Sequence, residues 1–198
     1  MCARYVNGPM TRDYWVQLRA FLDALGMRYN VAPTSIVPIL RFGDAAREPA
    51  AVRWGLIPSW SKDNKIAYRT INARSETVHE KPSFRAAFKR RRCIVLADGY
   101  YEWTGPKSDR QPHYIRLADD RPLVFFGLWE SWPGPKDDPL DEPLQTCTIN
   151  TTEFAYTDHL RSLLKPSDEE FVTNKVSKYV NKVGNEGPEC IERLPGKQ

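Results

Sequence analysis

Apolar residues near the start of the chain recur at helical spacing. Thr11 is a good N-cap residue and Gly26 is a typical C-terminal stop. Between them the apolar positions repeat every three or four residues, which predicts one amphipathic helix of about three turns. These positions are Tyr14, Trp15, Leu18, Phe21, Leu22 and Leu25.

Short β-rich runs fill much of the remaining chain. Residues 35–40 and 51–56 predict a hairpin, and Pro38 within the first run favours an edge strand or a bulge. Residues 93–97 are almost entirely apolar and predict a buried strand, while residues 113–117 and 123–129 predict a second strand pair. Ser83 is expected to cap a further short helix.

Seven strand candidates and three short helices follow one another without regular β-α-β alternation. This order predicts an α+β fold with a largely antiparallel sheet. We see no internal repeat and expect a single domain over residues 1–198.

Composition narrows the classes of function. Lys and Arg number 29 against 25 Asp and Glu, and the net charge of +4 permits a polyanionic partner without requiring one. The densest basic run, residues 89–92, is either a partner surface or a solvated helix end. The sequence shows no signal peptide and no apolar run that could span a bilayer, so we expect a cytoplasmic protein.

Cysteine spacing argues against a metal or disulfide framework. The four cysteines lie far apart and form no C-x-x-C pair, which favours reduced thiols without a metal or other cofactor. Cys2 differs from the others, because removal of Met1 would leave it with a free amine beside its thiol. Such an aminothiol condenses with an aldehyde to an imine, which the sulfur then closes to a thiazolidine. The alternative is that Cys2 is only a small buried apolar residue.

Four other residues are candidates for binding or proton transfer. Trp60, in a loop with Lys62, either stacks on a nucleic-acid base or covers the end of the core. Asn72 could orient a carbonyl or hydroxyl group, and Arg74 could bind a phosphate; capping is the alternative for both. Glu102 lies between Tyr101 and Trp103, where partial desolvation would suit a general acid or base; a surface glutamate is the alternative.

Together and in this order, several motifs resemble the SOS response-associated peptidase (SRAP) family over nearly the whole chain. Members of that family include shields of abasic sites in single-stranded DNA. The motifs are Met1-Cys2-x-Arg4, Arg28-Tyr29-Asn30-Val31-Ala32-Pro33, Trp54-Gly55-Leu56-Ile57-Pro58-Ser59-Trp60, Ile71-Asn72-Ala73-Arg74-Ser75-Glu76-Thr77, Lys81-Pro82-Ser83-Phe84, Arg91-Arg92-Cys93 and Ala97-Asp98-Gly99-Tyr100-Tyr101-Glu102-Trp103.

The resemblance implies a barrel-like core and a role for each candidate residue. Cys2 would trap the ring-opened abasic site as a thiazolidine crosslink. The reaction would be lyase-like and would serve the DNA damage response. Asn72 would hold the cysteine and the sugar, and Glu102 would move protons. The resemblance further implies three DNA contacts, in which Arg4 and Arg74 would bind phosphates and Trp60 would pack against a base.

Two departures from the family pattern matter. Ala3 replaces the usual glycine after the cysteine. The family histidine stands in an H-x-R-x-P segment, whereas here an internal block near residues 160–161 is missing, and His159, the remaining candidate, lacks that motif. We therefore expect the crosslink to form but its reversal to be impaired.

Three functions remain in order of preference. The first is the covalent abasic-site trap, acting as a monomer on single-stranded DNA, cytoplasmic and nucleoid-associated when bound to DNA, with no membrane, metal or cofactor. The second is a non-covalent single-stranded-DNA-binding module. The third is a thiol autopeptidase, a hydrolase acting on its own N-terminus.

Overall fold

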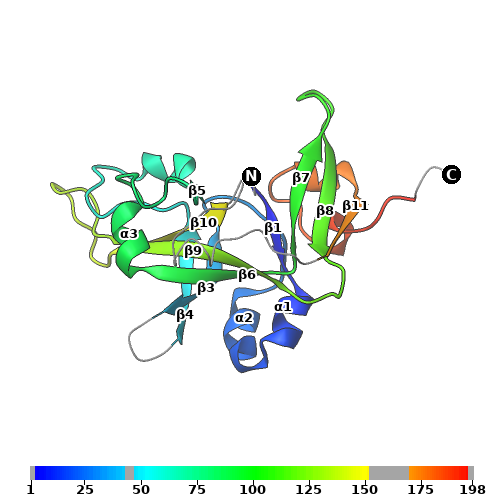
Figure 1. Cartoon of the computed structure of the whole chain (residues 1–198), viewed down its shortest axis with the longest axis horizontal. Helices are drawn as coiled ribbons and strands as arrows, with labels where there is room; N and C mark the ends of the chain where they lie inside the picture. Colours follow the sequence, from blue (N-terminus) through cyan, green and yellow to red (C-terminus); the bar gives the residue numbers. More distant parts are fainter. Residues whose placement is uncertain (1–2, 43–46, 152–169, 196–198) are drawn as a thin grey trace. The chain divides into compact units, whose positions relative to one another are not determined.

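The computed structural model (Figure 1) describes residues 3–42, 47–151 and 170–195 of the chain. The chain forms two compact units, each assembled from separate segments. Unit 1 contains Met1–Ala32, Leu96–Leu123 and Glu169–Gln198, and unit 2 contains Pro33–Val95 and Val124–Asp168. Among the described residues, no helix has both the length and the apolar content needed to cross a membrane.

Unit 1 is built on a five-stranded sheet with the order β11-β8-β7-β1-β2, in which every neighbouring pair is antiparallel. The strands are β1 (Tyr5–Asn7), β2 (Arg28–Val31), β7 (Gly99–Thr104), β8 (Gln111–Leu117) and β11 (Phe171–Lys175). One face is covered by a cluster of buried residues, namely Val6, Tyr101, Tyr114, Val176, Val180 and Cys190. A Cβ atom at Gly99 would lie 2.5 Å from the Ile115 carbonyl oxygen, so the start of β7 can approach β8 this closely only because residue 99 is glycine.

The first helical region is divided into α1 (Pro9–Tyr14), a 3-10 turn η1 (Val16–Leu18) and α2 (Arg19–Leu25). The prediction of one helix beginning after Thr11 was therefore wrong. The helix begins earlier because its first turn is capped by a residue distant in sequence. The Asp98 carboxylate accepts hydrogen bonds from the backbone N–H groups of Met10 and Thr11 and from the Thr11 hydroxyl. Thr11 thus lies inside α1, and a carboxylate from the bend between β6 and β7 caps the helix.

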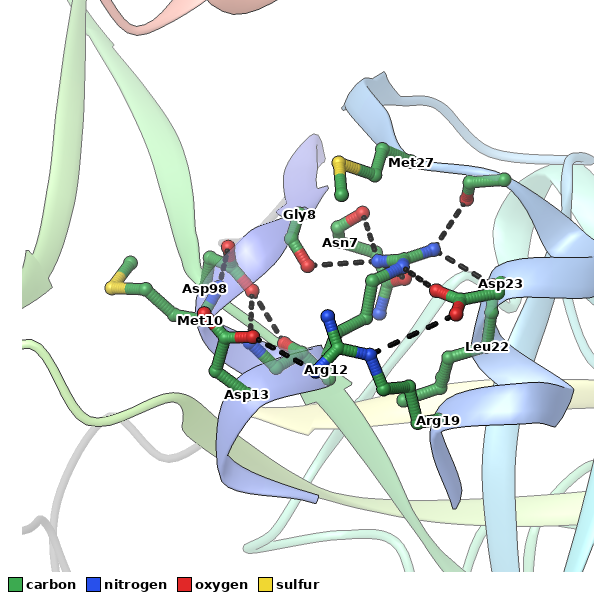
Figure 2. Close-up of polar contacts among 12 residues, drawn as sticks. Asn7, Gly8, Met10, Arg12, Asp13, Arg19, Leu22, Asp23, Met27 and Asp98 are labelled. Carbon is green, nitrogen blue, oxygen red and sulfur yellow. Dashed lines mark hydrogen bonds and ion pairs between the residues drawn. The ribbon is translucent and has the colours of Figure 1, made fainter. Parts of the chain in front are cut away.

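Arg12 holds this helical region to the end of β1 (Figure 2). Its side chain is buried and donates hydrogen bonds to the carbonyl oxygens of Asn7, Gly8, Leu22 and Gly26 at 2.7–3.1 Å. Its Nε also lies 3.1 Å from the Asp23 carboxylate. One buried guanidinium therefore satisfies carbonyl groups both at the end of β1 and at the end of α2.

Unit 2 is built on a six-stranded sheet with the order β4-β3-β6-β9-β10-β5. The strands are β3 (Ile36–Phe42), β4 (Arg47–Trp54), β5 (Asn72–Arg74), β6 (Arg92–Ala97), β9 (Leu123–Trp132) and β10 (Leu144–Thr151). Because β4 also pairs with β10, five of these strands close into a barrel and β5 lies beside it on β10. The α+β class with a largely antiparallel, barrel-like core is confirmed; the single domain stays a prediction.

Two further helical elements belong to unit 2. The 3-10 turn η2 (Lys65–Arg69) precedes β5, and α3 (Arg85–Arg90) follows it. No side chain caps α3, so the prediction that Ser83 is its N-cap was wrong. In unit 1, the short turns η4 (Lys178–Asn181) and η5 (Pro188–Cys190) follow β11.

Two predictions about strand pairing were also wrong. Pro38 does not mark an edge strand, because β3 pairs with β4 on one side and with β6 on the other. The β6 pairing begins at Ile39, just after the proline, so the missing N–H is tolerated. Strands β8 and β9 do not pair with each other, since β8 pairs with β7 and β11 while β9 pairs with β10.

Candidate functional site

A cation-rich pocket of about 410 Å³ opens in unit 1 at the start of the chain. Ala3, the residue bonded to Cys2, lines it together with Arg4. The other lining residues come from the β7–β8 hairpin and from η4, and they are Trp103, Lys107, Ser108, Asp109, Arg110, Lys178 and Asn181. Four of the lining side chains are cationic and one is a carboxylate, so the pocket favours an anionic ligand.

Internal hydrogen bonds keep the walls of the pocket in place. The Trp103 indole N–H donates to the Asn181 side-chain oxygen at 2.7 Å, and the Asn181 amide donates to the Arg110 carbonyl oxygen at 3.0 Å. Lys178 pairs with Asp109, the one carboxylate of the lining. The hairpin and η4 are therefore tied together, and the excess positive charge comes from Arg4, Lys107 and Arg110.

Arg4 is positioned by its neighbours within unit 1. Its Nη1 donates to the Asn30 side-chain oxygen at 2.6 Å and to the Val180 carbonyl oxygen at 3.1 Å. Its guanidinium lies 5.8 Å from the centre of the Trp103 ring, within the range of a cation–π contact. Burial lowers the pKa of Arg4 from its ordinary value, but an arginine remains cationic at neutral pH.

A hydrogen-bond network holds the segment of Arg28, Tyr29 and Asn30 in place beside Arg4. The Glu186 carboxylate accepts the Arg28 Nε–H at 2.8 Å and the backbone N–H groups of Tyr29 and Asn30 at 2.7 and 3.1 Å. The Asn30 amide in turn donates to three carbonyl oxygens, those of Val180, Lys182 and Asn185. This network fixes the acceptor that orients Arg4.

Glu102 lies on the other face of β7. It pairs in register with His113 of β8, and side chains directly opposite in an antiparallel pair share one face. Tyr101 and Trp103 alternate with it and point to the opposite face, where Tyr101 is part of the core cluster. Glu102 is partly buried in the middle of its strand, so its two aromatic neighbours in sequence are not the groups that cover it.

Asn72 and Arg74 lie together on β5 in unit 2. They flank Ala73, which packs into a core cluster, so strand alternation places both of their side chains on the other face. Asn72 is half-buried and pairs with Ile149 of β10, and Arg74 is exposed and pairs with Thr151. A polar side chain and a cation therefore project side by side from one short strand.

Trp60 is exposed in the turn after β4. Its side chain keeps 60% of its surface accessible, so the alternative that it covers the end of the core is wrong. Tyr68 of the following turn η2 is 66% exposed. This turn is anchored by buried Ala67, whose carbonyl oxygen would lie 2.7 Å from any Cβ at Gly55, where φ is +125°.

The internal cysteines Cys93, Cys147 and Cys190 are buried and unreactive. Burial raises the pKa of the Cys190 thiol to about 11, and raises the pKa values of Cys93 and Cys147 as well, with Cys147 adding to the effect at Cys93. All three are therefore protonated thiols at neutral pH rather than nucleophilic thiolates.

The predicted site residues fall into two groups. Arg4 and Glu102 belong to unit 1, whereas Trp60, Asn72 and Arg74 belong to unit 2. Within unit 2 the structure brings Asn72 and Arg74 together; within unit 1 it directs Arg4 and Glu102 to opposite faces of the sheet. Cys2 and His159 lie outside the described residues, as does the expected missing block.

Sequence reasoning missed the rest of the pocket. Lys107, Arg110 and Lys178 are ordinary surface cations in the sequence, and only the fold places them beside Arg4. The signal that could have found Tyr68 was the alternation of aromatic and basic residues over residues 60–69.

A closed barrel, a second antiparallel sheet and a cation-lined pocket at the chain start define an α+β protein suited to a polyanion. The chain belongs to the SRAP family: the model of "SOS response associated peptidase (SRAP)" matches residues 1–157. This confirms the resemblance found in the sequence.

Two named relatives and one solved structure are similar to the chain. The "Abasic site processing protein YoqW" of Bacillus subtilis is 39% identical, covering 83% of this chain and 85% of that protein. The "Abasic site processing protein HMCES" of Xenopus tropicalis is 30% identical, covering 84% of this chain and 66% of that protein. A crystal structure of a protein from Bacteroides thetaiotaomicron has a TM-score of 0.81 at 23% identity, covering 98% of this chain and all of that one, and shows the same fold.

Proposed function

We propose that this chain is an abasic-site processing protein that captures the ring-opened sugar of an abasic site in single-stranded DNA as a covalent adduct on Cys2. The observation that carries the proposal is the pocket at the chain start. Ala3 and Arg4 line it directly after Cys2, and its cations suit the phosphates that flank a lesion. The abasic-site relatives, 39% and 30% identical, support the same assignment.

The chemistry needs one nucleophile with two functional groups. After loss of Met1, the Cys2 amine attacks the sugar aldehyde, and loss of one water molecule gives an imine. The sulfur then adds to the imine carbon while the nitrogen gains the proton, which closes a thiazolidine without any change in oxidation state. Since the thiols of Cys93, Cys147 and Cys190 are buried and attached to no free amine, they cannot replace Cys2.

The other residues take supporting roles in the proposal. Glu102 would protonate the carbinolamine hydroxyl so that it leaves as water, and would then pass the thiol proton to the nitrogen as the ring closes, while Asn72 would hold the sugar. Arg4 and Arg74 would contact phosphates, with Arg4 already oriented by Asn30. His159 would assist reversal. Autopeptidase action at the N-terminus is the narrower alternative, and a peptide longer than one methionine released from the chain would favour it.

The test is incubation with single-stranded DNA that contains one abasic site, followed by a denaturing gel and intact mass measurement. We expect a shifted band whose mass equals protein plus DNA minus one water. The mass should remain unchanged after borohydride treatment, because a thiazolidine, unlike an imine, is not reduced. Binding in a native gel without any covalent band would instead identify a non-covalent single-strand-binding module.

Trp60 is expected to contribute a stacking contact. Replacing Trp60 by Ala should weaken binding to intact single-stranded DNA by about 1–3 kcal/mol, whereas Trp60→Phe should keep most of the affinity. Tyr14→Ala is the matched control, since Tyr14 is an aromatic residue that is 56% exposed and has no role assigned in DNA binding. Fluorescence anisotropy measures all three, and equal losses for Trp60→Ala and Tyr14→Ala would contradict the role.

A further inference from the structure

Three residues of the densest basic run of the chain, Lys89, Arg90 and Arg91, line one hollow on unit 2. Helix α3 and the residue after it form a hollow of about 290 Å³ that is lined by Arg85, Ala86, Lys89, Arg90 and Arg91. The opposite face of the helix is buried, since Ala87 packs with Phe84 and Leu128 in a core cluster. The cations therefore project from a helix that is held in place by the packing of its buried face.

The charges in this hollow are only partly balanced. Arg91 is neutralised, because its Nη2 lies 2.6 Å from the buried carboxylate of Glu130. Within the described part of the chain, the ion pairs include no partner for Arg85, Lys89 or Arg90. Three exposed cations therefore share one concave surface without a counter-charge.

Helix stability alone does not account for this arrangement. Lys89 and Arg90 lie in the last turn of α3, where cations interact favourably with the helix dipole. Arg85, however, is the first residue of the helix, where a cation is unfavourable, and it is four residues from Lys89, a like-charge spacing that costs about 0.2–0.5 kcal/mol. A solvated helix end explains two of the three cations and leaves Arg85 unexplained.

We propose that the α3 hollow binds the sugar-phosphate backbone of the single strand that carries the abasic site. This proposal rests on the proposed function. Ala86 lines the hollow together with the cations, and three cations suit successive phosphates. Helix α3 and strand β5, which carries Asn72 and Arg74, pack on one part of the unit 2 core, because Ala87 and Ala73 lie in the same core cluster.

The test compares two triple variants that each remove three positive charges. The first is Arg85→Gln with Lys89→Gln and Arg90→Gln. The control is Arg47→Gln with Lys136→Gln and Lys182→Gln, three exposed cations that line neither pocket. Affinity for intact single-stranded DNA is measured by anisotropy between about 50 and 200 mM salt, where phosphate contacts dominate the salt dependence. Thermal unfolding checks that both variants fold.

We expect the α3 variant to bind on the order of 10- to 100-fold more weakly at low salt and to lose about 2 units of the log–log salt slope, at about 0.7 per phosphate contact. The control should keep the slope of the unchanged protein. Equal behaviour of the two variants would overturn the proposal, and an effect on duplex DNA alone would overturn its assignment to a single strand.

A second measurement separates this inference from the proposed function. With saturating abasic-site DNA, the α3 variant should form the covalent adduct at the same rate as the unchanged protein, because α3 contacts only the backbone. A slower reaction at saturation would count against a purely backbone role. If the unchanged protein forms no adduct while the α3 variant still loses affinity, the covalent trap fails and the backbone site stands.

Discussion

Replacing Cys2 by Ala is expected to abolish the covalent adduct while leaving non-covalent binding of DNA almost unchanged. The variant keeps an N-terminal amine but has no sulfur, so any imine that forms cannot close to a thiazolidine and does not persist as a stable adduct. The DNA contacts proposed for Arg4, Arg74 and Trp60 do not involve the removed thiol. A denaturing gel measures the adduct, and anisotropy measures binding.

Cys2→Ser sharpens this prediction. Serine keeps the amine and offers an oxygen that closes the ring less readily, so the adduct should be an imine that borohydride converts to a stable product. Cys190→Ala is the matched control, because burial raises the pKa of the Cys190 thiol and keeps it protonated. This substitution should leave adduct formation unchanged. A full yield of adduct from Cys2→Ala would contradict the proposed chemistry, as would loss of the adduct in Cys190→Ala.

Retention of Met1 gives an independent check on the same chemistry. A chain whose start is extended by one residue has its Cys2 amine tied up in a peptide bond, so it cannot form the imine. Intact mass measurement before the reaction shows which fraction of the chains has lost Met1. That fraction should set the upper limit of the adduct yield.

The sequence predicted best those features that depend on local patterns. The apolar run at residues 93–97 became the buried strand β6, and the β-rich runs at residues 35–40 and 51–56 correctly indicated the hairpin β3–β4. The helix after Thr11 was misjudged because Asp98, 87 residues away in sequence, competes for its first N–H groups. Spacing within the segment itself contains no trace of that acceptor.

Candidate site residues follow the same rule. The motifs identified Arg4, Asn72 and Glu102 as candidates, but a strand-by-strand register was needed to show which face each occupies. Glu102 is an example, since its neighbours in sequence suggested an aromatic enclosure, and alternation along β7 directs them away. Lys178 joins the pocket through η4, which no local pattern connects to the chain start.

Replacing Arg12 by Met is expected to lower the free energy of unfolding by about 3–5 kcal/mol. Methionine fills a similar volume but donates no hydrogen bond, so the carbonyl groups of Asn7, Gly8, Leu22 and Gly26 lose a donor inside the fold (Figure 2). Leaving buried acceptors unsatisfied costs far more than the hydrogen bonds themselves contribute.

Arg19→Met is the matched control, because Arg19 also faces Asp23, at 3.9 Å, but is half exposed. Its loss should cost no more than about 0.5 kcal/mol, the value typical of surface ion pairs. Urea unfolding measures the free energy of unfolding of the two variants, which can be compared directly if their m-values are equal. Similar losses would show that the pairing with Asp23, rather than the four carbonyl contacts, is what Arg12 contributes. A large loss confined to Arg12 would mean that the stability of the fold depends on this buried guanidinium and its contacts with the four carbonyl groups.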